Sequence, residues 1–258
     1  MTLLSLDGVV LPGGTSVSLE VAAGEAIGIV GETGPVGEDL VSLLLGQSRP
    51  PGKTVFDGRN LSRAGRREIQ NIRRRLGILR PVSEAPLNPR RSIRAAVQEP
   101  LDVLLPGLKS AERDERVEAA LAASGAEAAW LAERPVGLPR GAVQAVALAR
   151  ALICAPDLLL AVEPFLGLEL EDSARLANRF LALRQNGGPA IVLVSRCPEF
   201  ALHVCDTIVV LHRGQCVETG TATDIRVLPG HAYTQQLVNA IPEPTGGAFD
   251  LRVAARPR

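Results

Sequence analysis

The sequence contains one segment whose residue types and spacing suggest phosphate chemistry. The stretch GIVGETGPVGEDLVSLLLG covers residues 28–46 and runs from an apolar segment into a glycine-rich turn. Phosphate-binding loops follow the pattern G-x-x-x-x-G-K-[ST], in which backbone N–H groups and the lysine hold the phosphates. When this pattern starts at Gly31, its last three positions hold Val36, Gly37 and Glu38. The segment therefore has the outline of a phosphate-binding loop but lacks its cationic residue.

Other residues of this loop also disfavour a bound anion. Pro35 has no backbone N–H to donate, and the β-branched Val36 resists a positive φ. Glu38 and Asp39 suit the start of a helix, by about 0.3–1 kcal/mol each, but would repel a triphosphate. Two interpretations stay open, a capped helix that binds nothing and a weak nucleotide site. The candidate nucleotide-binding residues are Gly31, Glu32, Thr33, Gly34, Pro35, Val36, Gly37, Glu38 and Asp39.

The elements that must position this loop alternate between apolar strands and helices. Buried or alternating apolar runs predict strands at 16–21, 26–31, 76–79, 157–162 and 190–195, a short strand within 50–61, and a hairpin over 206–220 that turns at Arg213-Gly214. Helices are predicted at 39–45, 66–76, 93–129 with breaks at Pro100 and Pro106, 143–153 and 172–186. Such alternation indicates an α/β fold with a mostly parallel sheet covered on both faces.

The stretch 83–150 has no strand signal and reads as a helical insertion. We expect a single domain over 1–258. Its core α/β lobe would comprise about 1–82 and 151–242, its helical subdomain about 83–150, and its C-terminal tail 243–258.

Composition excludes several functional classes. Lys+Arg and Asp+Glu both number 28, so net charge gives no argument for nucleic-acid binding. The four cysteines form no CxxC pair, and we expect no metal site. The N-terminus has no signal-peptide pattern, and no apolar run reaches the roughly 18 residues that a spanning helix needs. We therefore expect a soluble, cytoplasmic chain without direct membrane insertion.

The order of segments resembles the ATP-binding subunit of ABC transporters, in particular the importer class for dipeptides, oligopeptides and nickel. The resemblance covers about residues 3–242. It rests on APLNPRRSI with EPL at 99–101, on GLPRGAVQAVALARALICAPDLLLAVEP at 137–164, and on HAYTQQLVNAIP at 231–242. It implies a P-loop NTPase-type core sheet, a small N-terminal antiparallel β part and an inserted α-helical subdomain.

The resemblance also shows which family residues this chain replaces. Gly37 and Glu38 stand at the places of the loop lysine and the Mg²⁺-binding Ser/Thr, and no aromatic residue is present to stack on adenine in SLDGVVLPGG. The glutamine of the Q-loop aligns with Pro81, the Walker B aspartate with Val162, and the switch histidine with Arg196. The L-S-G-G-Q signature aligns with Leu138, Pro139, Arg140, Gly141 and Ala142. Glu163 aligns with the catalytic base and reads as a vestigial acid.

The resemblance and these losses together predict a degenerate, non-hydrolysing subunit that pairs with an active ATPase subunit and docks on transmembrane permeases. It would lie peripherally on the cytoplasmic face of the membrane. ATP and Mg²⁺ are the family's cofactors, and we expect this chain alone to bind neither tightly. An ABC-fold scaffold or regulatory module in a soluble enzyme assembly, and a functional ATPase with atypical motifs, remain as alternatives.

A docking groove is expected between the sheet and the helical part, near residues 78–100. Interfaces use apolar anchors within a polar rim. The candidate anchors are Leu87, Ile93 and Val97, and the candidate rim is Arg90, Arg91 and Arg94. The alternative is that these residues pack within the helical subdomain.

Overall fold

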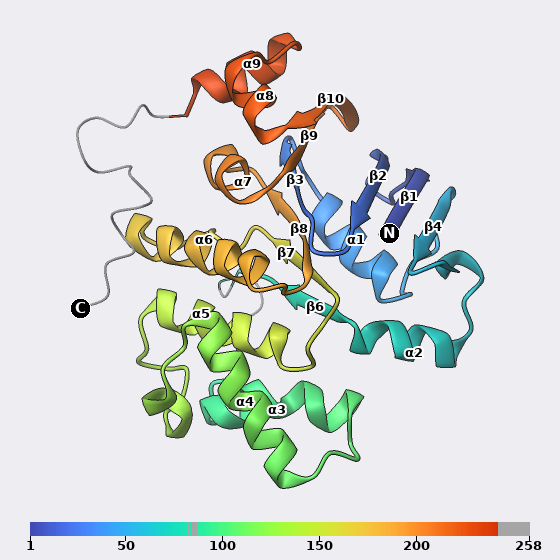
Figure 1. Cartoon of the computed structure of the whole chain (residues 1–258). Helices are drawn as coiled ribbons and strands as arrows, with labels where there is room; N and C mark the ends of the chain where they lie inside the picture. Colours follow the sequence, from blue (N-terminus) through green and yellow to red (C-terminus); the bar gives the residue numbers. More distant parts are fainter. Residues whose placement is uncertain (82, 84–86, 242–258) are drawn as a thin grey trace.

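Two β-sheets form the centre of the computed structural model, which describes residues 1–81, 83 and 87–241 (Figure 1). The smaller sheet is antiparallel and has the strand order β2-β1-β4-β5. The larger has the order β10-β9-β3-β8-β7-β6, with only β10 antiparallel to its neighbour. The strands are β1 Thr2–Val10, β2 Ser16–Ala22, β3 Ala26–Gly31, β4 Lys53–Phe56, β5 Arg59–Asn60, β6 Leu76–Leu79, β7 Leu158–Val162, β8 Ala190–Ser195, β9 Thr207–His212 and β10 Gln215–Thr221.

Helices cover both faces of the larger sheet and form a separate group at one end of the molecule (Figure 1). The helices are α1 Val36–Leu44, α2 Arg66–Arg74, α3 Ile93–Leu104, α4 Ser110–Ser124, α5 Arg140–Leu152, α6 Leu170–Gln185, α7 Pro198–Val204, α8 Ala222–Val227 and α9 Ala232–Asn239, with short 3₁₀ turns at Leu61–Arg63 and Ala128–Ala132. The predicted α/β architecture is confirmed. No helix of the described part of the chain is long and apolar enough to cross a membrane.

The central strands are continuous apolar runs because both faces of the sheet are covered. Every residue of β3, β7 and β8 is buried. One face packs against α1 and the antiparallel sheet, and the other packs against α5, α6 and α7. Parallel strands place their carboxyl ends at one edge, so the residues that follow β3, β7 and β8 meet there.

The helical group has an apolar core of its own, built from α3, α4 and α5. The described residues of 83–150 contain no strand, as predicted. The predicted break at Pro100 is wrong, because α3 continues through it to Leu104. The neighbouring Val97 and Leu101 are fully buried, and this burial outweighs the backbone bond that proline removes, a loss of about 3 kcal/mol.

Two predicted helix starts are also corrected. Helix α1 begins at Val36 rather than Asp39, and α5 begins at Arg140 rather than Val143. In both cases a proline, Pro35 or Pro139, occupies the position before the first helical residue. Its fixed φ is compatible with a helix start, and the missing N–H costs nothing there.

Candidate functional site

The loop between β3 and α1 has the strand–turn–helix form expected from the sequence. Gly31 and Gly34 adopt φ of 99° and 46°, which L-residues rarely adopt. A Cβ on Gly31 would lie 2.3 Å from the carbonyl oxygen of Leu211, so only glycine fits. Val36 is fully buried at the first position of α1, where a phosphate loop needs a glycine's freedom. The backbone turn is therefore retained while its side chains differ.

Gly37, at the place of the lysine, is in direct contact with Val162, at the place of the metal-binding aspartate. A Cβ on Gly37 would lie 2.3 Å from Cγ1 of Val162, closer than real side chains approach. Val162 ends β7 and is 5% exposed. The valine thus fills the space that a side chain at position 37 would need. Each of the two replacements accommodates the other.

The two carboxylates at the start of α1 have partners within the chain. The backbone N–H of Gly13 donates to Oδ2 of Asp39 at 2.9 Å. Gly13 also lies close to Pro35, because a Cβ on it would be 2.4 Å from Cγ of that proline. Arg80 Nη2 donates to Oε2 of Glu38 at 2.6 Å. The turn between β1 and β2 therefore lies against the loop, and Arg80 neutralises Glu38.

Glu163 follows β7 in a strained conformation and contacts the loop. Its φ is 43°, which costs a non-glycine residue of order 1–3 kcal/mol. Its Oε1 accepts hydrogen bonds from Oγ1 of Thr33 at 3.3 Å and from the backbone N–H of Arg196 at 3.0 Å. The Arg196 guanidinium lies 3.3 Å from the same oxygen, but this side chain is 61% exposed, so the ion pair contributes at most about 1 kcal/mol.

The segment Leu138–Ala142 lies at the start of α5, where Arg140 contacts the residues after β7 rather than the loop between β3 and α1. Arg140 Nη1 donates to the carbonyl of Gly167 at 3.3 Å. Gly141 is packed against Asp172, whose carboxyl carbon would lie 2.2 Å from an added Cβ. No residue of 138–142 carries a hydroxyl group, so this segment offers no serine to a phosphate.

The sequence did not reveal that the C-terminal segment packs against the loop. Tyr233 lies 3.1 Å from a Cβ placed on Gly31, and its ring stacks on His212 at 4.1 Å. Nδ1 of His212 is 3.3 Å from Oε1 of Glu32. Burial and the Glu32 carboxylate raise the pKa of Tyr233. The family likeness in 231–241 thus has a structural explanation, because this segment packs against the loop through Tyr233. Pro242, the last residue of that likeness, lies outside the described residues.

For Leu87, Ile93 and Val97, the candidate docking anchors, the structure bears out the alternative of packing within the helical subdomain. All three are buried in the apolar core of the helical group, where they pack with residues of α4 and α5. The nearby arginines lie at the surface: Arg91 pairs with Glu99 at 3.1 Å, Arg94 pairs with Asp114 at 2.8 Å, and Arg90 is exposed.

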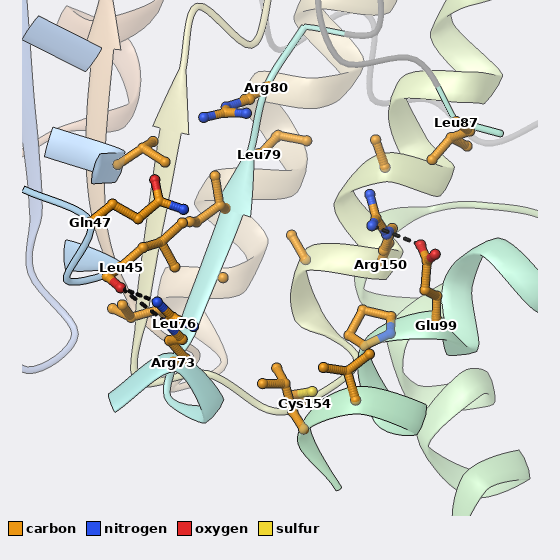
Figure 2. A pocket seen from close by; sticks show the side chains of 18 residues that line it. Leu45, Gln47, Arg73, Leu76, Leu79, Arg80, Leu87, Glu99, Arg150 and Cys154 are labelled. Atoms are coloured by element: carbon orange, nitrogen blue, oxygen red, sulfur yellow. Dashed lines mark hydrogen bonds and ion pairs between the residues drawn. The ribbon is translucent and has the colours of Figure 1, made fainter. Parts of the chain in front are cut away.

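A cavity of about 590 Å³ lies in the predicted region, between β6 and the helical group (Figure 2). We call this cavity the groove. Its apolar lining includes Leu45, Leu76, Leu79, Leu87, Val103 and Leu104. Its polar lining includes Arg73, which donates to the carbonyl of Leu45 at 3.0 and 2.6 Å, and Arg150, which pairs with Glu99 at 2.8 Å. Within the described residues, no cluster of three His, Cys, Asp or Glu could hold a metal ion.

Comparisons with known proteins agree with this architecture. The model of the family described as ABC transporter matches residues 15–166. A protein of Brucella ovis, named provisionally as a peptide import ATP-binding protein, is 30% identical over 245 residues, which are 93% of this chain and 76% of the relative. The oligopeptide transport ATP-binding protein OppF of Streptococcus mutans is 29% identical over 89% of this chain and 75% of its own length.

Solved structures share the fold. A subunit of the cbiONQ ABC transporter complex from Clostridium perfringens superposes with a TM-score of 0.76, at 21% identity, over 87% of this chain and 90% of its own. A dimeric ATP-binding cassette bound to ADP and Pi has a TM-score of 0.72, at 22% identity, over 85% of this chain and 98% of its own. The chain therefore belongs to the ABC transporter family and has the fold of its ATP-binding cassettes.

Proposed function

We propose that this chain is a non-hydrolysing ATP-binding-cassette subunit of a peptide- or nickel-class importer. It would pair with a second, ATPase-competent subunit and dock on transmembrane permeases at the cytoplasmic face of the membrane. The names of the peptide-import relatives support the transporter class. The replaced residues of the loop support the absence of hydrolysis.

The contact between Gly37 and Val162 carries this proposal. Phosphoryl transfer depends on positioning and on neutralising charge, which the family achieves with a lysine and with a magnesium ion. Here Gly37 and Val162 stand in place of the lysine and the metal-binding aspartate, and a methyl group of Val162 occupies the space beside position 37. Losing one charge-stabilising donor typically lowers a rate by about 10²–10³. Losing both, together with the glutamine and the histidine, leaves no detectable turnover in this chain's own site.

The loop also needs no phosphate to satisfy its polar groups. Glu38 is paired with Arg80, Asp39 accepts the Gly13 N–H, and Glu163 accepts from Thr33. Carboxylates at the N-terminus of α1 already complement its dipole. An incoming triphosphate would have to displace these contacts and would meet two negative charges. This arrangement favours a loop that is stable without nucleotide.

The groove supports the docking part of the proposal. Its floor is apolar, and Arg73, Arg80 and Arg150 lie along it (Figure 2). An amphipathic helix fits such a surface, with its apolar face on the floor and polar groups toward the arginines. We infer that a cytoplasmic segment of a permease occupies the groove.

Photo-crosslinking with an azido-ATP in the assembled complex tests the proposal. The chain is purified together with its permeases and its partner ATPase, and label is counted on each subunit. We expect label on the partner and none above background on this chain. Strong, Mg²⁺-dependent labelling of this chain would contradict the proposed lack of nucleotide binding. Failure to co-purify with any permease would instead favour a soluble assembly component.

A further inference from the structure

Gln144 is a buried polar side chain in α5 whose contacts join three separate parts of the chain. It is 1% exposed, and its Nε2 donates to the carbonyl of Arg80 at 3.3 Å and to the carbonyl of Pro164 at 3.0 Å. Burying an amide is unfavourable unless it forms hydrogen bonds. The two carbonyls follow β6 and β7, so the amide ties α5 to the carboxyl edge of the sheet.

The first of these carbonyls belongs to a residue that connects the groove with the loop. Arg80 lines the groove (Figure 2). Its guanidinium binds Glu38 at 2.6 Å in the first turn of α1. Its backbone is held by Gln144 and its side chain by Glu38. Arg80 is therefore hydrogen-bonded to both α5 and α1.

The second carbonyl follows a strained residue. Pro164 comes directly after Glu163, whose φ is 43° and whose carboxylate accepts from Thr33 in the loop. Strained backbone persists only where its surroundings over-determine it. The Glu163 N–H, which donates to the carbonyl of Val194 at 2.8 Å, supplies one restraint. Gln144 supplies another at the next residue.

We propose that Gln144 is a positioning residue that couples the groove to the loop between β3 and α1. Through the hydrogen bonds to these two carbonyls, Arg80 and the Glu163–Pro164 turn move with α5. A load applied to the groove is thereby transmitted to Glu38 by way of Arg80, and to Thr33 by way of Glu163. That a permease segment applies this load rests on the proposed function. The internal link does not, and its test uses the isolated chain.

Hydrogen exchange of Gln144→Leu provides the first test. Leucine keeps the apolar packing but removes the amide donor from the carbonyls of Arg80 and Pro164, so we expect exchange about tenfold faster in 33–39, 76–81 and 163–168. The matched control is Val146→Ala, which removes a fully buried apolar group from the same helix and no hydrogen bond. It should lower the melting temperature without selecting those three segments. Equal exchange patterns in the two variants would overturn the proposal.

The pH response of Gln144→Glu provides a second test, which also holds if Gln144→Leu fails to fold. A protonated Glu has one O–H to donate, whereas its carboxylate has none and would face two carbonyls. The pKa of the introduced glutamic acid is therefore raised in the folded chain. Its stabilising hydrogen bond is fully present below the unfolded pKa of about 4.3 and is lost as pH rises through the folded pKa. Arg80, which carries one of the carbonyls, and Glu163, which precedes the other, are the same in the wild-type chain.

At each pH, exchange in Gln144→Glu is compared with that of the wild-type chain. We expect the excess exchange in the three segments to shrink as the pH falls, whereas Gln144→Leu should show a constant excess. An excess in Gln144→Glu that does not change with pH would show that hydrogen-bond donation at this position does not hold the segments, and would overturn the proposal.

Discussion

Gly37 and Val162 are in mutual contact at the two positions where an ATP-binding cassette needs a lysine and an aspartate. A Cβ on Gly37 would be 2.3 Å from Cγ1 of Val162, and the valine is 5% exposed. The two replacements therefore depend on each other. Restoring the lysine alone would place a side chain in the space that Val162 occupies, and restoring the aspartate alone would bury a carboxylate without the lysine.

This dependence predicts non-additive effects on stability. Gly→Ala within a helix ordinarily stabilises by about 0.5–1 kcal/mol. Gly37→Ala should instead destabilise the chain by about 1–3 kcal/mol, because the added methyl overpacks against Val162. In a Val162→Ala background the same change should cost less than it does alone. Urea unfolding of the four chains measures this, and strict additivity would show that the contact is not tight.

Glu163 is predicted to have no catalytic role. Its carboxylate is engaged by Thr33 and Arg196, and the neighbouring metal ligand is replaced by Val162. Glu163→Gln should therefore leave turnover of the assembled complex within about twofold of wild type. A twofold change in rate corresponds to less than about 1 kcal/mol in the activation free energy. A steady-state ATPase assay with a measurement of bound ATP checks it. Trapped ATP together with lost turnover is the outcome that contradicts the account.

Replacing two apolar residues of the groove by aspartate should separate effects on folding from effects on docking. Leu87→Asp should unfold the helical group, because it buries a charge. Val103→Asp should fold normally, since this groove residue is 74% exposed, yet reduce recovery of permease in a pull-down. Val227→Asp, at a 65% exposed valine outside the groove lining, is the matched control and should retain wild-type recovery. Equal recovery with Val103→Asp and Val227→Asp would exclude this groove as the docking surface.

The contact between β10 and the segment before α9 predicts a pH dependence of stability. Partial desolvation raises the pKa of Glu218, but hydrogen bonds from the N–H groups of Gly230 and His231, together with the nearby Thr234 hydroxyl, lower it by more, so the net shift of the pKa is downward. A lowered folded pKa gives stability that is present above the unfolded value of about 4.3 and is lost as pH falls through the folded value.

Thermal unfolding of Glu218→Gln against the wild-type chain therefore has a defined pH profile. The wild-type advantage should be largest near neutral pH and should shrink in acid below about pH 4. An advantage that grows on acidification would mean that the carboxylate is not the favoured form in the folded chain.

Much of the architecture could be predicted from the sequence because its strands are buried on both faces. The runs AIGIVG and AIVLVS are unbroken and apolar, and they became β3 and β8. Helix starts were less accurate, since Pro35 and Pro139 favour starts that apolar spacing does not reveal. For Leu87 the sequence left a docking anchor and a core residue as two alternatives, because the two look alike in sequence, and the structure shows the buried one.

The candidate site was predicted in outline but not in its contacts. The phosphate-loop pattern located Gly37 and Glu38, and the family resemblance located Val162 and Glu163. Their packing and pairing depend on residues far away in the chain, such as Gly13 against Pro35. Gln144 carried no signal either, because its importance comes from two backbone carbonyls, and backbone groups are the same in every sequence.

Calorimetric titration of the isolated chain with Mg-ATP tests the central claim most directly. The loop lacks a lysine and a metal ligand, and its carboxylates are already paired. We therefore predict no binding heat at low-millimolar ATP. A Kd of about 1 mM corresponds to a binding free energy of about −4 kcal/mol. A competent cassette from the same transporter serves as the positive control. A dissociation constant in the low micromolar range for this chain would contradict the account.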